Sequence, residues 1–337
     1  MPHPLVTMIV GFGAVAEGFA SDKCMEQHFC YASHAEVLRD HPAFDWKAVV
    51  DPSAQARKRA AEIWRVPMVF ETIDEAIEHV RPSVAVIASP PNDRLASFKK
   101  LERIRGILLE KPVATNLNDV ESMAAIAEER SQLVQVNYWR RADNDLTKLL
   151  VPKINSLIGE LQTAFAIYGN GLHNNGSHLI DLIRFLVDDV DAVLACGYGY
   201  PAGPIVGDID IPFILKLVNG ATVHFSTIRF KHYREASLDL WGTRGRLALY
   251  NESLSLFHYP LAENRSLENT NEIASDRPQI IPKKRSSAFW TMYDNLYNSL
   301  TRGHKLINPL KEAVKTERII ASIIEAQQRK NSWVKVN

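Results

Sequence analysis

The chain has 337 residues, of which 46% are hydrophobic and 23% are charged. This is more residues than one hydrophobic core typically serves, and it indicates two domains. Lys plus Arg balances Asp plus Glu at 39 each, so the net charge favours neither nucleic acid nor a membrane surface as a partner.

Cysteine is rare, and Cys24, Cys30 and Cys196 form no Cys-x-x-Cys pair. This low, odd number argues against a disulfide framework or a zinc knuckle, so we expect no bound metal. The first residues lack a charged stretch followed by an apolar one, and no apolar run reaches the length of a bilayer span. We therefore expect a cytoplasmic protein.

Short apolar runs alternate with helical patterns through the first part of the chain. The runs predict strands over Thr7–Val10, Trp46–Val50, Val84–Ala88, Gly106–Leu109 and Leu133–Asn137. The patterns between them predict helices over Ala14–Ala20, Ala54–Ile63, Ile73–Val80, Arg94–Arg103 and Asn118–Glu129. Such alternation predicts a parallel, doubly wound sheet.

The pattern changes in the rest of the chain. Apolar runs predict strands over Leu161–Tyr168, Ile211–Val218, Ala221–Phe225, Glu235–Trp241 and Arg246–Tyr250. Asn219-Gly220 between two of these runs predicts a hairpin. Helices are predicted over Leu179–Leu186, Phe289–Thr301 and Leu310–Arg329, and the polar segment Leu261–Ile281 predicts a loop or an insertion. The fold class is therefore α/β, with a Rossmann domain over residues 1–115 and an α+β domain with a large, mostly antiparallel sheet over residues 116–337.

A glycine-rich sequence, GFGAVA, directly follows the first predicted strand. Its first glycine permits a tight turn, its second lets the backbone approach a pyrophosphate, and the small Ala16 lets a helix pack closely on the strand. The helix start also offers backbone N–H groups and a positive dipole end to phosphates. We assign to the dinucleotide site Gly11, Phe12, Gly13, Ala14 and Val15.

Asp51 and Pro52 follow the second strand, where a carboxylate accepts hydrogen bonds from the adenine ribose and repels a ribose phosphate. This favours NAD over NADP. Asp51 lies 38 residues after Gly13 rather than about 20, which an insertion around residues 21–34 would explain. The alternative is that Asp51 is only a turn residue.

A proline-rich segment follows the third strand. Ligands of doubly wound sheets bind at the carboxyl ends of the strands, so we assign Ser89, Pro90 and Asn92 to the cofactor site. The alternative is a turn that only starts the next helix.

The motifs GFGAVA, VVDP, ASPPN and EKPVA, in this order, resemble the glucose-fructose oxidoreductase / inositol dehydrogenase / MocA family. Residues 137–141 are similar to its N-x-x-x-R segment, and residues 174–181 to its D-x-G-x-H-x-x-D segment. The resemblance covers nearly the whole chain. It implies an open C-terminal sheet that forms a homodimer or homotetramer, and interconversion of a sugar or cyclitol hydroxyl and a ketone. Residues 33–35 and 169–172 are similar to a branch that acts on sugars, including nucleotide-linked ones, in surface-polysaccharide metabolism.

The resemblance also implies catalytic roles. Lys111 would hold the substrate oxygen near the nicotinamide, and Glu110 would lie beside the cofactor. His178 fits the general base, while Asp181, one turn later, orients it, contacts substrate or makes a buried structural hydrogen bond. Asn174 stands where many relatives carry aspartate, and an amide is no base at neutral pH. Proton transfer then falls to His178 alone or is shared with Lys111.

Further side chains complete the expected site. Arg140 and Arg141 either clamp an anionic substrate or the cofactor, or form an interdomain salt bridge; we assign Arg140 to substrate and Arg141 to cofactor. Tyr138, Trp139 and His173 are expected to be pocket walls, and we assign Tyr138 and His173 to the substrate. His34 either reaches the site or lies in a surface loop.

Two other functions stay open on the sequence alone. One is redox-assisted elimination or glycoside cleavage on the same scaffold. The other is a non-catalytic nucleotide-binding regulator, which Asn174 motivates.

Overall fold

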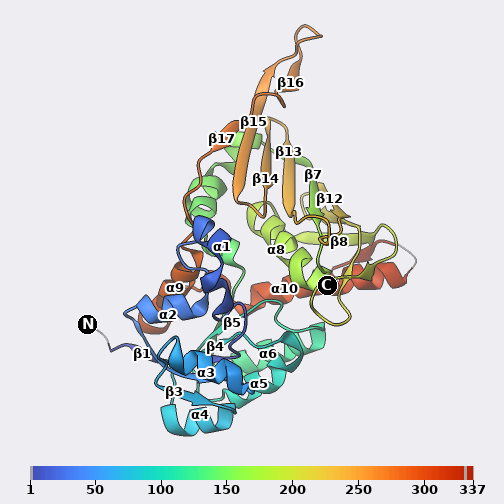
Figure 1. Cartoon of the computed structure of the whole chain (residues 1–337). Coiled ribbons are helices and arrows are strands. Elements are labelled where there is room, and N and C mark those ends of the chain that lie inside the picture. Colours follow the sequence, from blue (N-terminus) through green and yellow to red (C-terminus); the bar gives the residue numbers. More distant parts are fainter. Residues whose placement is uncertain (1–2, 330–331, 337) are drawn as a thin grey trace. The chain divides into compact units, whose positions relative to one another are not determined.

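The computed structural model describes residues 3–329 and 332–336, which form two compact units (Figure 1). The first contains the described residues up to Asn144 together with Arg285–Lys315. The second contains Asp145–Lys284 together with the described residues from Thr316 onward.

The first unit contains a six-stranded sheet in the order β3-β2-β1-β4-β5-β6, and all neighbouring strands run parallel. The strands are β1 (Leu5–Val10), β2 (Phe44–Val50), β3 (Met68–Phe70), β4 (Val84–Ile87), β5 (Gly106–Leu109) and β6 (Leu133–Val136). This is the strand order of the doubly wound dinucleotide-binding fold. Every residue of β4 and β5 is buried, which explains their unbroken apolar sequences. The predicted parallel sheet is confirmed.

Helices cover both faces of this sheet. They are α2 (His34–Asp40), α3 (Ala54–Glu62), α4 (Ile73–Val80), α5 (Arg94–Lys100), α6 (Leu117–Glu129) and α9 (Ala288–Arg302), while α1 (Lys23–His28) has no buried residue and belongs to neither core. Met8 and Val10 of β1 belong to the core under α4, α5 and α6, whereas Ile9 belongs to the core under α2, α3 and α9. The C-terminal α9 thus returns to the N-terminal sheet, where Gln135 of β6 donates a hydrogen bond to the Met292 carbonyl at 2.7 Å.

The predicted helix over Ala14–Ala20 is wrong. The chain forms turns there and then a short 3₁₀ turn over Gly18–Ser21. The carbonyls of Val15 and Ala16 accept hydrogen bonds from the backbone N–H groups of His34 (3.4 Å) and Ala35 (2.9 Å) at the start of α2. These carbonyls are therefore paired with the start of α2 rather than with a continuing α-helix.

The second unit contains a large sheet in the order β16-β15-β14-β13-β7-β12-β11-β8-β18, with β17 paired to β15. Among its described pairs only β7 and β12 run parallel, so the predicted mostly antiparallel sheet is confirmed. Its main strands are β7 (Leu161–Tyr168), β8 (Val190–Ala195), β11 (Phe213–Leu217), β12 (Thr222–Thr227), β13 (Ser237–Gly242), β14 (Gly245–Tyr250) and β15 (Ser255–Glu263). The shorter strands are β16 (Asn271–Ile273), β17 (Gln279–Ile281) and β18 (Val334–Lys335), and β9 (Tyr200–Pro201) pairs separately with β10 (Ile209–Asp210).

One face of this sheet packs on helices. The second unit holds α7 (Ile154–Ile158), α8 (Ser177–Leu186) and the later part of α10 (Leu310–Gln328). Apolar residues of α8 and α10 share one core with the inward residues of β7, β11 and β13. The predicted hairpin at Asn219-Gly220 is also confirmed, because it joins β11 to the antiparallel β12.

The predicted loop over Leu261–Ile281 is also wrong. β15 runs on through Glu263 and pairs with β16, and β17 pairs with its earlier part. In Figure 1 this hairpin extends beyond the neighbouring strands of its sheet. Its polar sequence resembles a loop because most of its side chains face solvent, while main-chain pairing sets the structure.

The compact units divide the chain at a different place from residue 115, the predicted domain boundary. Residues 116–144 stay with the first unit because β6 pairs with β5, and residues 285–315 return to it through α9. The boundary at residue 115 stays a prediction about domains. None of the helices among the described residues has both the length and the apolar composition that a membrane span requires.

Candidate functional site

The glycine-rich turn lies at the carboxyl end of β1. Gly11 has a φ of +87°, and a Cβ on it would come within 2.5 Å of the backbone nitrogen of Ser89, so only glycine fits. A Cβ on Gly13 would instead meet nothing within 4 Å. Gly13 and Ala14 are exposed and Val15 is half-buried. The first glycine is therefore needed for packing, whereas the second leaves an open backbone surface.

Asp51 lies beside this turn, at the carboxyl end of β2. Its Oδ2 accepts a hydrogen bond from the Phe12 N–H at 2.7 Å, and its Oδ1 accepts one from the Ser53 N–H at 2.8 Å. Arg57 donates to the carbonyls of Asp51 (2.8 Å) and Pro52 (2.9 Å). The carboxylate is thus held at the glycine-rich turn and also fixes Ser53, the residue that caps the start of α3.

The segment after β4 lies at the same edge of the sheet. Pro90 and Asn92 are exposed, while the Oγ of Ser89 is buried and makes no hydrogen bond to any residue that the structure describes. A buried hydroxyl without a partner is costly, and a ligand supplies one. The open Gly13, the Asp51 carboxylate and this hydroxyl together fit a dinucleotide.

Glu110, Lys111 and Pro112 follow β5, also at this edge. The buried guanidinium of Arg94 donates to the carbonyl oxygens of Glu110 and Pro112, and its Nε donates to the Ser89 carbonyl at 2.8 Å. One side chain therefore fixes the main chain on both sides of the half-buried Lys111. Arg94 was not among the residues predicted from the sequence, where its only signal was a charge beside the proline-rich segment.

The side chain of Glu110 lies in a buried polar cluster. Nε2 of His34 donates to its Oε1 at 2.9 Å, and Nδ2 of Asn137 donates to the same oxygen at 2.5 Å. The Tyr293 hydroxyl lies 3.0 Å from Nδ1 of His34. His34 is therefore buried rather than in a surface loop, with 0% exposure. Burial acts to raise the pKa of Glu110, but His34, Asn137 and Arg94 together hold that pKa below its ordinary value.

The predicted segment after β6 contributes one core residue and two arginines. Tyr138 is 1% exposed and lies within the core of the first unit. The guanidinium of Arg140 is buried and stacks over the Trp139 ring, 4.7 Å from its centroid. Arg141 is half-buried.

In the second unit, two buried aspartates hold the segment before α8. Asp210 accepts hydrogen bonds from the N–H groups of Asn170 (3.2 Å) and Gly171 (2.8 Å). Asp208 accepts from those of His173 (3.0 Å) and Asn174 (2.9 Å). These carboxylates satisfy the N–H groups that a helix start leaves unpaired. The Asp-x-Asp spacing before a strand was the missed signal.

Asn174 lies in a π-helical turn over Leu172–Gly176 that leads into α8. Its Nδ2 donates to the Asn170 carbonyl at 3.0 Å. An ionised aspartate cannot donate this bond, which gives a structural reason for the amide at this position.

His173 faces a buried carboxylate from α10. Its Nδ1 lies 3.3 Å from Oε2 of Glu317, which is 1% exposed. Burial acts to lower the pKa of His173, but the carboxylates of Glu317 and Asp208 outweigh this effect and raise it. Sequence reasoning had no signal for Glu317, which lies 144 positions further along the chain.

His178 lies in the first turn of α8 and is half-buried, and Asp181 follows one turn later with 1% exposure. The second unit therefore brings together His173, Asn174, His178 and Asp181. Lys111 and the expected cofactor residues belong to the first unit.

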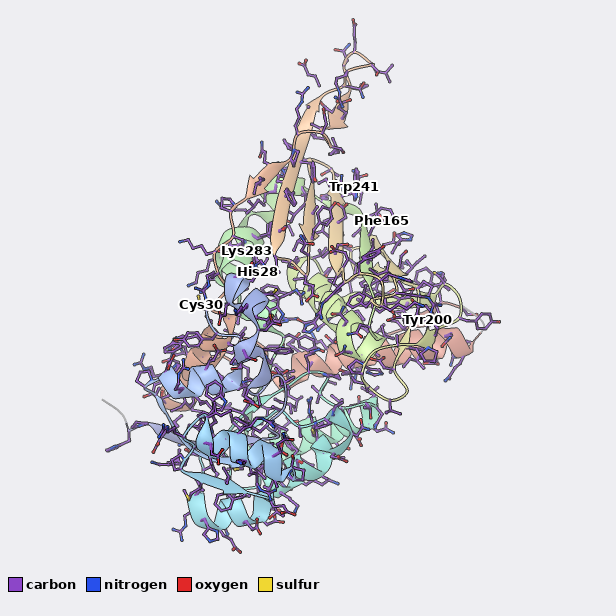
Figure 2. The ribbon with its side chains drawn as sticks, viewed as in Figure 1. His28, Cys30, Phe165, Tyr200, Trp241 and Lys283 are labelled. Atoms are coloured by element: carbon purple, nitrogen blue, oxygen red, sulfur yellow. The ribbon has the colours of Figure 1, made fainter. Side chains whose placement is uncertain are left out.

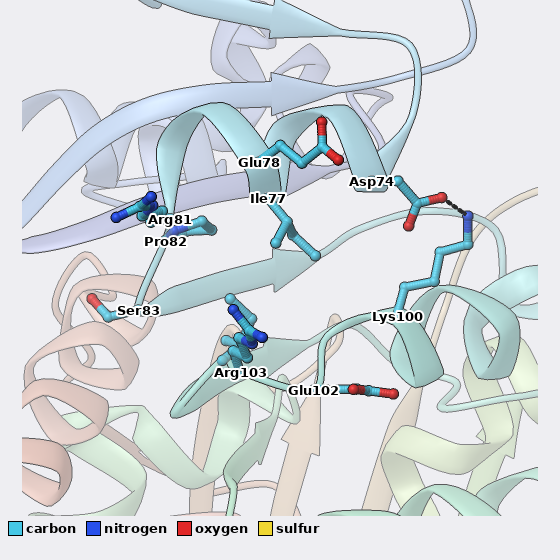
Figure 3. Close-up of a pocket in the computed structure, with 10 residues that line it drawn as sticks. Asp74, Ile77, Glu78, Arg81, Pro82, Ser83, Lys100, Glu102 and Arg103 are labelled. Atoms are coloured by element: carbon cyan, nitrogen blue, oxygen red, sulfur yellow. Dashed lines mark hydrogen bonds and ion pairs between the residues drawn. The ribbon is translucent and has the colours of Figure 1, made fainter.

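A cavity of about 890 Å³ lies elsewhere on the first unit (Figure 3). Ser83 and Ile104 line it and precede β4 and β5, so it lies at the amino ends of the strands. Charges of both signs line it, including the ion pair between Lys100 and Asp74. The glycine-rich turn, Asp51, Ser89 and Lys111 instead follow the carboxyl ends of β1, β2, β4 and β5.

Two family models match the chain. One, described as an oxidoreductase family with an NAD-binding Rossmann fold, matches residues 28–138. The other, the GFO/IDH/MocA C-terminal domain, matches residues 160–248.

Among curated proteins, the rhizopine catabolism protein MocA of Rhizobium meliloti is 25% identical over 208 residues. This match covers 56% of the chain and 65% of that protein, so the chain spans less than two thirds of this relative.

Solved structures share the fold over their whole length. Levoglucosan dehydrogenase in complex with NADH and L-sorbose has a TM-score of 0.78 at 15% identity, covering 99% of each chain. The WlbA dehydrogenase of Bordetella pertussis, in complex with NADH and UDP-GlcNAcA, has a TM-score of 0.74 at 15% identity, also covering 99% of each.

Proposed function

The chain belongs to the GFO/IDH/MocA family of NAD-binding oxidoreductases, and from this premise we propose that it interconverts a hydroxyl and a ketone on a sugar or cyclitol by hydride transfer. One observation carries the proposal. The turn that bears Lys111 is fixed by Arg94 at the same sheet edge as the open Gly13 backbone, Asp51 and the buried Ser89 hydroxyl. A fixed cation beside a dinucleotide site suits an alcohol–ketone interconversion.

The cofactor is NAD, and its nicotinamide supplies the redox chemistry. Residues of the glycine-rich turn, Asp51 and the segment after β4 would hold it. The set comprises Gly11, Phe12, Gly13, Ala14, Val15, Asp51, Pro52, Ser89, Pro90, Asn92 and Arg141, with Glu110 and Lys111 beside it.

We assign the substrate chemistry to Lys111, His178 and Asn174. The ammonium of Lys111 holds the reacting oxygen and stabilises negative charge on it. His178 accepts the hydroxyl proton, or returns it in the reverse direction. Asn174 orients the substrate by hydrogen bonding and takes no proton.

The remaining predicted residues fit supporting roles. Arg140 and His173 offer positive charge to an anionic sugar, such as a nucleotide-linked one. Tyr138 and Asp181 are each 1% exposed, so we assign them supporting rather than direct contacts with the substrate. UDP-GlcNAcA in the complex of the Bordetella enzyme and L-sorbose in that of levoglucosan dehydrogenase support a sugar-like substrate.

A panel of sugars, cyclitols and nucleotide sugars, assayed for NADH formation or consumption, tests the proposal. Lys111→Ala should lower kcat about 10²–10³-fold while NADH still quenches fluorescence on binding. Lys100→Ala is the matched control, because this exposed lysine pairs with Asp74 at the other edge of the sheet. Unchanged turnover in Lys111→Ala would refute the mechanism. Substrate loss without net NADH change would favour redox-assisted elimination.

We also propose that the chain forms a homodimer or homotetramer through the open face of the second unit's sheet. Phe165 is 51% exposed and Ile167 37% exposed on β7, whereas their neighbour Ala166 is buried in the core. Phe165 stacks on His224 with ring centroids 5.4 Å apart, and Trp241 lies on the adjacent β13 (Figure 2). Clustered aromatic side chains on one face suit a self-complementary interface.

Light scattering tests this assembly. Phe165→Glu should shift the protein toward the monomer, and Val206→Glu, at a position 89% exposed outside the sheet, should not. An unchanged mass for Phe165→Glu would argue against this face.

A further inference from the structure

We propose that His34 is a positioning residue for Lys111, acting through Glu110. The inference rests on the proposed role of Lys111. His34 comes from the segment before β2, 76 residues earlier in the chain than Glu110, and its side chain is completely buried.

The first step is that the buried carboxylate of Glu110 needs hydrogen-bond donors. A carboxylate that is 4% exposed pays a large desolvation cost unless donors surround it. The amide of Asn137 and the imidazole of His34 donate to its Oε1. Without the imidazole, only Asn137 of these two donors remains. We then expect the side chain of Glu110 to move or to take a proton.

The second step concerns what Glu110 is attached to. Arg94 fixes the carbonyls of Glu110 and Pro112, and Lys111 lies between them. The hydrogen bonds to the Glu110 carboxylate add to this support. Residue 110 is then held both at its carbonyl, by Arg94, and at its side chain. A shift of Glu110 therefore also moves Lys111, because a single peptide unit joins the two residues.

The third step is that His34 also contacts the glycine-rich turn. Its backbone N–H donates to the Val15 carbonyl at 3.4 Å, and the next residue, Ala35, donates to the Ala16 carbonyl at 2.9 Å. One residue thus joins the turn expected to hold the cofactor to the turn that bears Lys111. The contact with the turn is made by the main chain, so it persists in side-chain variants of His34, which then test the contact with Glu110 alone.

The Tyr293 hydroxyl fixes the ring of His34 from α9, at 3.0 Å from Nδ1. This geometry suggests two different replacements. Glutamine places its amide near the position of Nε2 and can still donate to Glu110. Asparagine places its amide near the position of Nδ1 and reaches Tyr293 but not Glu110.

His41 provides the matched control. It caps the same helix α2, is 4% exposed and packs on the same α9, stacking on Trp290 with centroids 4.2 Å apart. Its Nε2 lies 3.1 Å from Asp294 rather than from Glu110. His41→Asn therefore removes a comparable buried imidazole without disturbing the carboxylate.

The experiment reads Lys111 directly. Lysines are reductively ¹³C-methylated, the Lys111 signal is assigned by its loss in Lys111→Arg, and spectra of the full chain are compared with and without NADH. His34→Asn should shift or broaden the Lys111 signal, whereas His34→Gln and His41→Asn should keep it. With a substrate from the panel, His34→Asn should lower kcat about 10²-fold with little change in KM, and His34→Gln should restore most of it.

A folded His34→Asn with wild-type Lys111 signal and kcat would overturn the proposal. If that variant does not fold, His34→Ala decides, because it also removes the donor to Glu110 but adds no second amide to the core: a shifted Lys111 signal supports the proposal, and an unchanged one overturns it. The spectrum needs no turnover. A shifted signal in His34→Asn together with full activity of Lys111→Ala would keep the positioning role and refute only the proposed function.

Discussion

The Oδ2 atom of Asp51 accepts a hydrogen bond of 2.7 Å from the backbone N–H of Phe12, which lies 39 residues earlier in the chain. This contact holds the carboxylate at the glycine-rich turn. Arg57, a basic side chain beside Asp51, donates to the carbonyls of Asp51 and Pro52 and lies 3.2 Å from Glu71. The local charges therefore favour a ribose without a phosphate.

Replacing Asp51 should change the choice between cofactors. Asp51→Asn keeps an acceptor for the Phe12 N–H but removes the negative charge, so NADPH should gain about tenfold in affinity relative to NADH. Asp51→Ala also removes the acceptor and should weaken both. Fluorescence titration with each nucleotide measures the ratio, and an unchanged ratio in Asp51→Asn would show that the carboxylate does not face the ribose.

The two glycines of the turn should behave differently. Gly11→Ala places a Cβ within 2.5 Å of Ser89 at a positive φ, so we expect a destabilisation of about 2–4 kcal/mol. Gly13→Ala meets no atom within 4 Å and should fold normally, but it should bind NADH about tenfold more weakly or worse. Thermal unfolding and NADH titration separate the effects. Normal NADH affinity in Gly13→Ala would exclude close approach of the cofactor there.

Restoring aspartate at position 174 should destabilise the second unit. The carboxylate loses the donor to the Asn170 carbonyl and adds a negative charge beside Asp208, which accepts from the N–H of the same residue. We expect a loss of about 1–3 kcal/mol, measured by denaturant unfolding. Asn118→Asp, an exposed position in α6, makes the same change in charge as a control. A more stable Asn174→Asp would contradict the structural role of the amide.

The contact between His173 and Glu317 should make stability depend on pH. Because the folded pKa of His173 is raised, this stabilisation is fully present below the ordinary histidine pKa, about 6.5, and is lost as pH rises through the raised value. Glu317→Gln should therefore lower Tm most near pH 6 and progressively less in mildly alkaline buffer. Glu325→Gln breaks an exposed pair with Arg329 on the same helix and should have little effect at any pH. An equal loss of Tm for Glu317→Gln at all pH values would contradict a charged His173.

The sequence predicted the parallel sheet well because its strands are buried on both faces and read as apolar runs ending at the ligand edge. β4 and β5 show this most clearly, since all their residues are buried. Order along the chain also located Asp51, Ser89 and Lys111 at that edge. The antiparallel β7 was equally readable, because buried and exposed residues alternate along it.

Secondary structure predicted from local sequence was wrong where a segment distant in the chain supplied the main-chain hydrogen bonds. Residues 14–20 have helical composition, yet α2 donates to their carbonyls, and the polar β15–β16 hairpin is set by main-chain pairing. Glu110 could be identified from its motif, but its partners His34 and Tyr293 come from α2 and α9, which only the packing of the first unit brings together. The sequence by itself thus determined which strand ends carry the chemistry, because periodicity and turns are local. Tertiary structure alone decided which buried charges are paired, because the need to satisfy a buried carboxylate or imidazole is met by residues far away in the chain.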